Sequence, residues 1–211
     1  MTEQRLAGAQ KSLTKLLAGS LYDDAGGSNK RLTGLRACCN ETAATAYGNI
    51  AEDDLVAADG TKPWEGKRDT TTEGIGLDVL RALASGAHVR DGQGGNADLL
   101  VTTLDLYNAF LSIIQLAQRF TKEGGQTAKV GFTGIEFEGK DLFPDDFCPS
   151  GYCGALNTNH IGFAVHQKGY FMRTPWRMIP DSPDDETLKI YVDLNMVVNN
   201  RKAHKLHSNL S

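Results

Sequence analysis

Cysteine, histidine and acidic side chains carry most of the reactive chemistry in this sequence. Cys148 and Cys153 flank four residues in C-P-S-G-Y-C, a spacing compatible with one half of a zinc site. A complete site needs a second pair of ligands, and His160 and His166 lie downstream without the usual spacing. We therefore favour the interpretation that both cysteines are small loop residues. A disulfide between them is geometrically feasible, but the reducing cytosol expected for a chain with only four cysteines disfavours it.

Acidic residues gather in one stretch of the sequence, which contains Glu136, Glu138, Asp141, Asp145 and Asp146. Paired carboxylates can exchange protons with a substrate or hold a divalent cation. The stretch lacks the Asp-x-Asp-x-Asp-Gly spacing of a calcium loop, and such acidic loops are more often simply solvated. A metal-dependent hydrolase that uses His160, Asp145 and Cys148 remains an alternative function.

Signature motifs of enzymes are missing from the sequence. It contains no G-x-S-x-G nucleophile elbow and no phosphate-binding loop. The glycine-rich segment 92–95 lacks the flanking strand and helix of a dinucleotide site. The sequence therefore predicts no catalytic residue, no cofactor and no bound metal, and we expect that the protein is not an enzyme.

The composition is that of a folded protein without the basic excess that suits nucleic acids. The 211 residues are 40% hydrophobic and 23% charged, and the net charge is −4. Proteins that mainly grip phosphates are usually basic. The basic segment 201–207 leaves DNA contact as a secondary hypothesis beside that of a solvated terminus. No apolar run is long enough to cross a bilayer, and an early acidic residue argues against a signal peptide, so we expect no membrane partner.

Apolar periodicity predicts three helices. Residues 4–18 are expected to form an amphipathic helix, and residues 74–83 a second helix that the preceding threonines would cap. The clearest pair of elements is a strand over 98–102 followed by a helix to about residue 120, with Thr103 as its cap.

Short β-like runs and turn-rich segments occupy the rest of the chain. Strands are expected over 130–137, 155–158, 161–165, 169–173 and 187–198. Irregular segments are expected over 43–71, 141–154 and 180–185. This mixture predicts an α+β fold, and the long loop over 43–71 is a candidate functional segment.

Several short motifs follow one another in a distinctive order along the chain. The sequence reads D-L-L-V-T-T-L-D-L-Y-N-A-F, then Q-R-F, then G-F-T-G-I-E-F-E-G-K-D-L-F-P-D-D over residues 98–146. This stretch is followed by the segments G-A-L-N-T-N-H-I and L-N-M-V-V-N-N-R-K-A-H-K-L. It is preceded by L-T-G-L-R-A, A-Y-G-N-I-A and K-P-W-E. In this order the motifs resemble the major capsid proteins of tailed bacteriophages, whose fold is also used by encapsulin shells. The resemblance spans roughly the whole chain.

This resemblance implies a phage major-capsid-type fold with two lobes. An axial lobe, a sheet flanked by helices, would comprise residues 72–185. A partial peripheral lobe with a shortened spine helix would comprise residues 1–71, which include the long loop, and 186–211. Relatives usually carry an N-terminal arm and an extended loop that clasp neighbouring subunits, and we expect this chain to lack both, so that its unaided assembly is in question.

The function implied by the resemblance is that of a structural subunit of an icosahedral phage capsid. Copies would self-assemble into pentamers and hexamers that enclose the genome, with other capsid or scaffold proteins as partners and only non-specific contact with packaged DNA. The protein would belong to the virion and be assembled in the host cytoplasm. An encapsulin-like, non-viral shell protein is the alternative. Within the long loop, the candidate subunit-interface residues are Tyr47, Trp64, Lys67 and Arg68.

Overall fold

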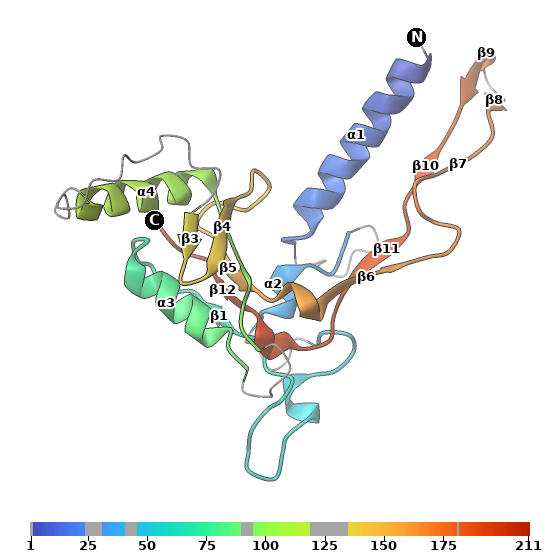
Figure 1. Cartoon of the computed structure of the whole chain (residues 1–211). Coiled ribbons are helices and arrows are strands. Elements are labelled where there is room, and N and C mark those ends of the chain that lie inside the picture. Colours follow the sequence, from blue (N-terminus) through green and yellow to red (C-terminus); the bar gives the residue numbers. More distant parts are fainter. Residues whose placement is uncertain (1, 24–30, 41–45, 90–94, 119–134, 181) are drawn as a thin grey trace.

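The computed structural model describes residues 2–23, 31–40, 46–89, 95–118, 135–180 and 182–211. Figure 1 shows a sheet with two helices beside it, from which a helix and a long narrow hairpin extend in the same general direction. We call the sheet with its two helices the body, and the hairpin over residues 161–198 the ribbon.

The body is built on a mixed sheet of six strands in the order β1-β12-β5-β2-β4-β3. These strands are β1 (Arg68–Asp69), β2 (Leu99–Thr102), β3 (Ile135–Phe137), β4 (Lys140–Pro144), β5 (Cys153–Leu156) and β12 (Lys205–His207). The pairs β1–β12 and β2–β4 are parallel, whereas β12–β5, β2–β5 and β3–β4 are antiparallel. The last strand of the chain thereby returns to the body, where it lies between β1 and β5.

Helices α3 (Leu77–Gly86) and α4 (Leu104–Gln118) pack against this sheet. Helix α4 begins after Thr103, whose Oγ1 accepts a hydrogen bond from the backbone N of Leu106 at 3.4 Å, so the cap expected from the sequence is present. The shared core contains fully buried Leu80, Phe110 and Leu142. Phe110 meets Phe137 edge to face, with ring centroids 6.1 Å apart.

A second apolar cluster joins the body to the base of the ribbon. It includes Tyr22, the short helix α2 (Leu35–Cys38), Tyr152 of the body, and Met196 and Val198 of the ribbon. Because residues from both ends of the chain meet here, this cluster fixes where the ribbon leaves the body.

The ribbon is a two-stranded antiparallel ladder in three sections. β6 (Ile161–Val165) pairs with β11 (Leu194–Val198), β7 (Met172–Arg173) with β10 (Ile190–Tyr191), and β8 (Arg177–Ile179) with β9 (Ser182–Thr187). Helix α1 (Thr2–Ser20) extends beside it, with a groove between them.

The α+β fold class predicted from the sequence is confirmed, as are the helix over 4–18 and the strand over 161–165. The strand predicted over 98–102 is β2, and the helix predicted after Thr103 is α4 as far as residue 118. The strand predicted over 155–158 is wrong at its end, because β5 ends at Leu156 and η2 (Thr158–His160) follows. The loop predicted over 180–185 is wrong where β9 begins, because the acidic residues there pair with β8. The loop over 141–154 is wrong at its start, where β4 pairs with β2 and β3. The strand over 187–198 is interrupted between β10 and β11. Helix α3 is preceded by Gly76 and has no side-chain cap, so the threonine cap is wrong.

Three further expectations are not decided by these elements. Residues 130–134 of an expected strand and 119–120 of an expected helix lie outside the described residues. The two-lobe division stays a prediction, although the sheet draws strands from both predicted ranges. No helix within the described ranges is long and apolar enough to cross a membrane.

Candidate assembly surface

Helix α1 is packed against the rest of the chain much less than is usual for a helix of a folded protein. Between residues 3 and 19 no side chain is buried, and Leu16 is 59% exposed. Most helices in proteins owe their stability to packing of an apolar face rather than to intrinsic propensity. The leucines of α1 therefore lack a complete partner surface within the described chain.

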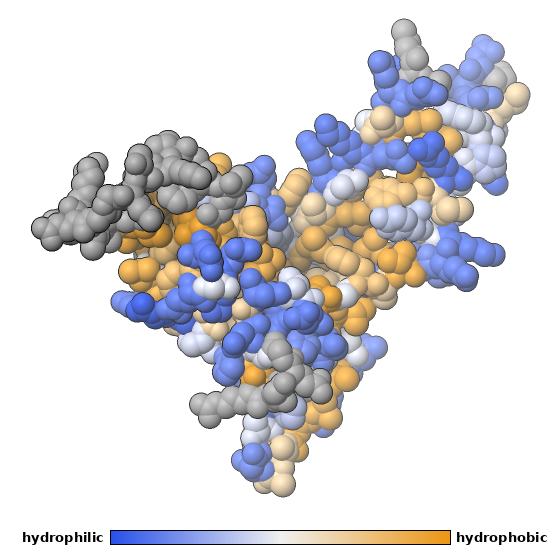
Figure 2. Space-filling view, viewed as in Figure 1, coloured by the Kyte–Doolittle hydropathy of each residue, from blue (hydrophilic) through white to orange (hydrophobic). Residues whose placement is uncertain are grey.

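The ribbon is uncovered in the same way. Its register places Phe163 opposite Met196 on one face, yet Met196 is buried near the body whereas Phe163 is 54% exposed. Further out, Trp176 and Met178 are exposed, Met178 to 71%. Figure 2 shows hydrophobic surface running along the ribbon and beside α1. An isolated two-stranded ladder is marginally stable in water, so this surface is suited to contact with another molecule.

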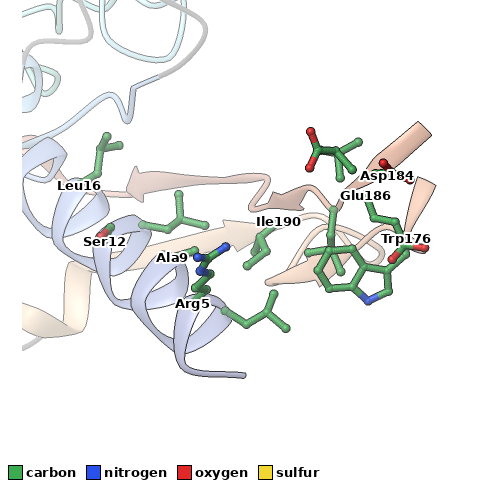
Figure 3. A pocket seen from close by; sticks show the side chains of 13 residues that line it. Arg5, Ala9, Ser12, Leu16, Trp176, Asp184, Glu186 and Ile190 are labelled. Atoms are coloured by element: carbon green, nitrogen blue, oxygen red, sulfur yellow. The ribbon is translucent and has the colours of Figure 1, made fainter. Parts of the chain in front are cut away.

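A groove of about 1060 Å³ lies between α1 and the outer half of the ribbon. Its walls are mainly apolar, with leucines of α1 on one side and Trp176 and Ile190 on the other. Figure 3 shows Arg5 and Ala9 of α1 across the groove from Trp176 and Ile190. The groove is open along its length, and Asp184, Asp185 and Glu186 also line it, so it has the character of a docking surface rather than of an enclosed substrate pocket.

The two strands of the outer ribbon carry opposite charges. One strand contains Arg173 and Arg177, and the other contains Asp184, Asp185 and Glu186 together with a single lysine, Lys189. All of these side chains are exposed. A surface with separate basic and acidic edges can pair with a second copy of itself, because each edge finds its opposite on the neighbour.

Two of the predicted interface residues surround a buried arginine. Arg201 is fully buried, and its guanidinium lies 5.8 Å from the ring centre of Tyr47 and 5.9 Å from that of Trp64. Tyr47 is itself buried, and the indole N–H of Trp64 donates to the carbonyl of Tyr47 at 3.2 Å. Both rings therefore anchor the loop over 46–66 to its own chain.

Arg201 also binds this loop through its hydrogen bonds. It donates to the carbonyl oxygens of Cys38 at 2.7 Å, Trp64 at 2.9 Å and Asn40 at 2.9 Å. Glu52, which is almost fully buried, lies 3.5 Å away and accepts a hydrogen bond from the backbone N of Gly66 at 2.9 Å. Arg201 was expected to belong to a basic tail, and no pattern in the sequence marks it as a buried hub.

The other two predicted interface residues contact neighbouring segments of the body. Lys67 Nζ donates to the carbonyls of Gly86 at 2.6 Å and Lys202 at 3.2 Å. Arg68 Nε donates to Ser208 Oγ at 3.2 Å. The interface role of Tyr47, Trp64, Lys67 and Arg68 stays a prediction. Their contacts within the chain show that the first effect of each side chain is to fix the loop against the body.

The three residues of the hydrolase alternative are engaged separately. Asp145 accepts a hydrogen bond from the Tyr22 hydroxyl, His160 Nδ1 lies 2.8 Å from Asn199 Oδ1, and Cys148 donates to the carbonyl of Tyr152 at 3.6 Å. Burial raises the pKa of the Cys148 thiol to about 12, so this sulfur is a protonated thiol and a poor nucleophile at neutral pH. These three groups do not form a metal-binding cluster in the described structure.

Asp69, Glu73 and His207 do bring potential metal ligands together, within 4.8 Å of one another. His207 is buried, and its Nε2 lies 2.9 Å from Glu73 Oε1 and 3.8 Å from Asp69 Oδ1. Its Nδ1 accepts a hydrogen bond from the backbone N of Asn209 at 3.3 Å, so the proton of the neutral ring is on Nε2. Nε2 then donates to Glu73 Oε1, so in this arrangement the cluster is a hydrogen-bonded clamp that holds the C-terminal strand.

Comparison with known proteins finds likeness at the level of structure alone. No protein-family model matches the sequence, and no curated protein matches it. A chain of the cyanophage A-1(L) capsid asymmetric unit is similar over 99% of this chain and 69% of its own length, with a TM-score of 0.71 and 15% identity. The holo-SrpI encapsulin complex from Synechococcus elongatus PCC 7942 matches over 100% of this chain and 66% of its own, with a TM-score of 0.59 and 12% identity.

A third solved structure, the satellite phage P4 procapsid that includes the size determination (Sid) protein, matches over 99% of this chain with a TM-score of 0.52 and 14% identity. This chain covers 64% of the procapsid chain, so it spans about two thirds of the length of the shell proteins that it resembles. At these identities the likeness establishes the fold. The fold of this chain is the one shared by these phage capsid and encapsulin chains.

Proposed function

We propose that this chain is a structural subunit of an icosahedral phage capsid and that it works by self-assembly rather than by catalysis. Copies form pentamers and hexamers that enclose the genome. The observation that carries the proposal is the uncovered α1 and ribbon on a chain with the fold of shell proteins. Exposed apolar surfaces of this kind would promote aggregation of a monomer, whereas a shell would bury them between its subunits.

The ribbon supplies the self-complementarity that assembly needs. The basic edge with Arg173 and Arg177 of one copy meets the acidic edge with Asp184 and Glu186 of the next. Trp176 and Met178, on the same strand as the arginines, lose their contact with water on assembly. Charged edges select the partner and its orientation, and buried apolar area supplies most of the free energy of association.

The loop over 46–66 is a second surface for contact with a neighbour. Tyr47 and Trp64 hold its base through Arg201, and it exposes Leu55 and Val56 further out. A loop that is anchored in this way loses little conformational freedom when it binds. The predicted interface residues would therefore act by presenting this loop in a fixed position.

The proposed partners and location follow from a phage shell. They are other capsid or scaffold proteins, packaged DNA through non-specific contacts, and the virion after assembly in the host cytoplasm. The likeness to an encapsulin chain favours a second candidate, a non-viral shell that uses the same surfaces. The nucleic acid content of purified particles separates the two, because a capsid encloses a genome.

Substitution of exposed apolar residues of the ribbon tests the assembly surface. Phe163→Asp and Met178→Asp each place a charge in the proposed contact, so both should shift the protein from large particles to small species in sedimentation velocity. Ser85→Asp, on the exposed face of α3, is a matched control that adds the same charge to the body and should assemble normally. Unchanged far-UV circular dichroism establishes that the variants fold.

The same assay tests the loop. Trp64→Ala combined with Arg68→Ala loosens the base of the loop and should weaken assembly. Normal particles from this double variant would refute a role for the loop, whereas normal particles from both ribbon variants would refute the ribbon as an assembly surface.

A further inference from the structure

Two short connections join the ribbon to the body. The outgoing connection is the 3-10 helix η2 (Thr158–His160) between β5 and β6, and the returning connection contains η3 (Arg201–Ala203) between β11 and β12. His160 ends η2, and its Nδ1 lies 2.8 Å from the side-chain oxygen of Asn199, which follows β11. The backbone N of Asn199 also donates to the carbonyl of His160 at 3.2 Å. His160 thus ties the two connections together.

His204 makes a second tie between the same connections. It directly follows η3 and is fully buried, and its Nδ1 accepts a hydrogen bond from the backbone N of Asn157 at 3.2 Å. Asn157 directly precedes η2. Both histidines therefore link the outgoing chain to the returning chain at the point where the ribbon begins.

These hydrogen bonds fix the positions of the ring protons. His204 Nδ1 accepts, so the proton of its neutral ring is on Nε2; Asn199 Oδ1 can only accept, so the proton of His160 is on Nδ1. Both Nε2 atoms are buried and have no hydrogen-bond partner among the described residues. The arrangement therefore satisfies the hydrogen-bonding capacity of two neutral rings at both Nδ1 atoms but at neither Nε2 atom.

A second proton on His204 would disturb the tie that this ring makes. It must go to Nδ1, where it opposes the N–H of Asn157 and breaks that hydrogen bond. Burying an unsatisfied polar or charged group is costly, so the closed junction disfavours the protonated ring of His204.

We propose that this junction is an acid-sensitive hinge, in which His204 ties the returning connection to the outgoing one only while its ring is neutral, and His160 makes the second tie between them. Acidification protonates His204, weakens the junction between the two connections and frees the ribbon to change its angle to the body. The consequence for a shell rests on the proposed function, since the ribbon would then move between neighbouring subunits, but the hinge itself does not depend on assembly.

The charges around His204 agree with this behaviour. Burial, reinforced by the neighbouring His160, lowers the pKa of His204 from 6.5 to about 4. The Asp98 carboxylate opposes this lowering with a smaller effect, and it is held by hydrogen bonds from the backbone N and hydroxyl of Thr158. His160 and Asp98 are the ionisable groups that act on the buried ring.

The difference between the pKa of His204 in the closed junction and in the open junction sets how strongly the open population depends on pH. A depressed pKa stabilises the closed junction above about pH 6.5, and this stabilisation is lost as the pH falls toward about 4. If the ring recovers its ordinary pKa in the open junction, the open population rises roughly thirty-fold between about pH 7.5 and about pH 5.

Hydrogen exchange of the purified chain tests the hinge directly. The wild-type protein is compared at each pH with the variant His160→Gln/His204→Gln, whose side chains keep hydrogen-bonding groups but cannot be protonated in this range. Comparing the two proteins at the same pH removes the pH dependence of chemical exchange. His166→Gln, on the exposed part of the ribbon, is the matched control.

At about pH 5 the wild-type protein and the control should lose protection against hydrogen exchange over residues 157–161 and 199–204. The loss should be roughly thirty-fold relative to the double variant. Strand β2 should stay protected in all three proteins. If the double variant does not fold, His160→Gln alone should show a reduced response. Equal exchange of wild type and histidine variants at both pH values would overturn the hinge, as would simultaneous loss of protection in β2. Neither result would bear on assembly, which sedimentation reports separately.

Discussion

Replacement of Arg201 by methionine should sharply reduce the stability of the chain. Arg201 is fully buried, donates to three backbone carbonyls and faces the buried carboxylate of Glu52. Methionine has a similar length but no donors. The variant removes three hydrogen bonds to backbone carbonyls and leaves Glu52 as a buried charge without the arginine that faces it.

The expected magnitude follows from these losses. Removing one partner of a buried ion pair typically costs about 3–5 kcal/mol, because the remaining charge stays buried without compensation. Native domains have only about 5–15 kcal/mol of stability in total, so the variant should be marginally folded. The cost should appear as a large drop in the urea concentration at the midpoint of unfolding.

A double-mutant cycle separates the ion pair from the rest of the site. Arg201→Met/Glu52→Met removes both charges, so it should be less destabilised than the sum of the single variants, with a coupling energy of about 1–3 kcal/mol. Urea unfolding followed by circular dichroism at low protein concentration measures all four corners. A loss below about 1 kcal/mol for Arg201→Met, or additive single variants, would refute the view of Arg201 as a buried hub.

Two further predictions concern glycine and cysteine residues. Gly66→Ala should lower the free energy of unfolding by about 1–3 kcal/mol, because a Cβ there would lie 2.4 Å from the carbonyl oxygen of Asn40. Gly8→Ala, in open space on α1, should instead be neutral or stabilising by up to about 1 kcal/mol. Equal unfolding midpoints of the two variants would contradict this contrast. Cys148 and Cys153 should react with iodoacetamide much more slowly than free cysteine at about pH 8, because burial raises the pKa of each thiol to about 12; rapid modification detected by mass spectrometry would contradict the buried environment.

The sequence predicts those parts of the fold in which local pattern and burial agree. The helix after Thr103 has an apolar face at regular spacing and a capping side chain, and both features appear in the structure. The strand before it is short, apolar and central in the sheet. The ordered resemblance over residues 98–146 points to the fold that the structural comparisons find.

Other parts depend on contacts that are distant in the sequence. The acidic strand β9 lacks the composition of a strand and forms because β8 lies beside it across the turn. Arg201 and His204 look like members of a basic tail, yet the chain return from the ribbon buries both. The exposure of Phe163 and Met178 likewise follows from the ribbon leaving the body, which periodicity in a single strand does not reveal.

Negative-stain electron microscopy of the purified chain, combined with mass measurement of the same sample, tests the central claim most directly. The proposed function predicts rings or closed particles whose masses correspond to pentamers, hexamers or shells built from them. A uniform population of monomers at every concentration tested, with normal circular dichroism and no particles in the images, would contradict the claim that copies of this chain associate with one another.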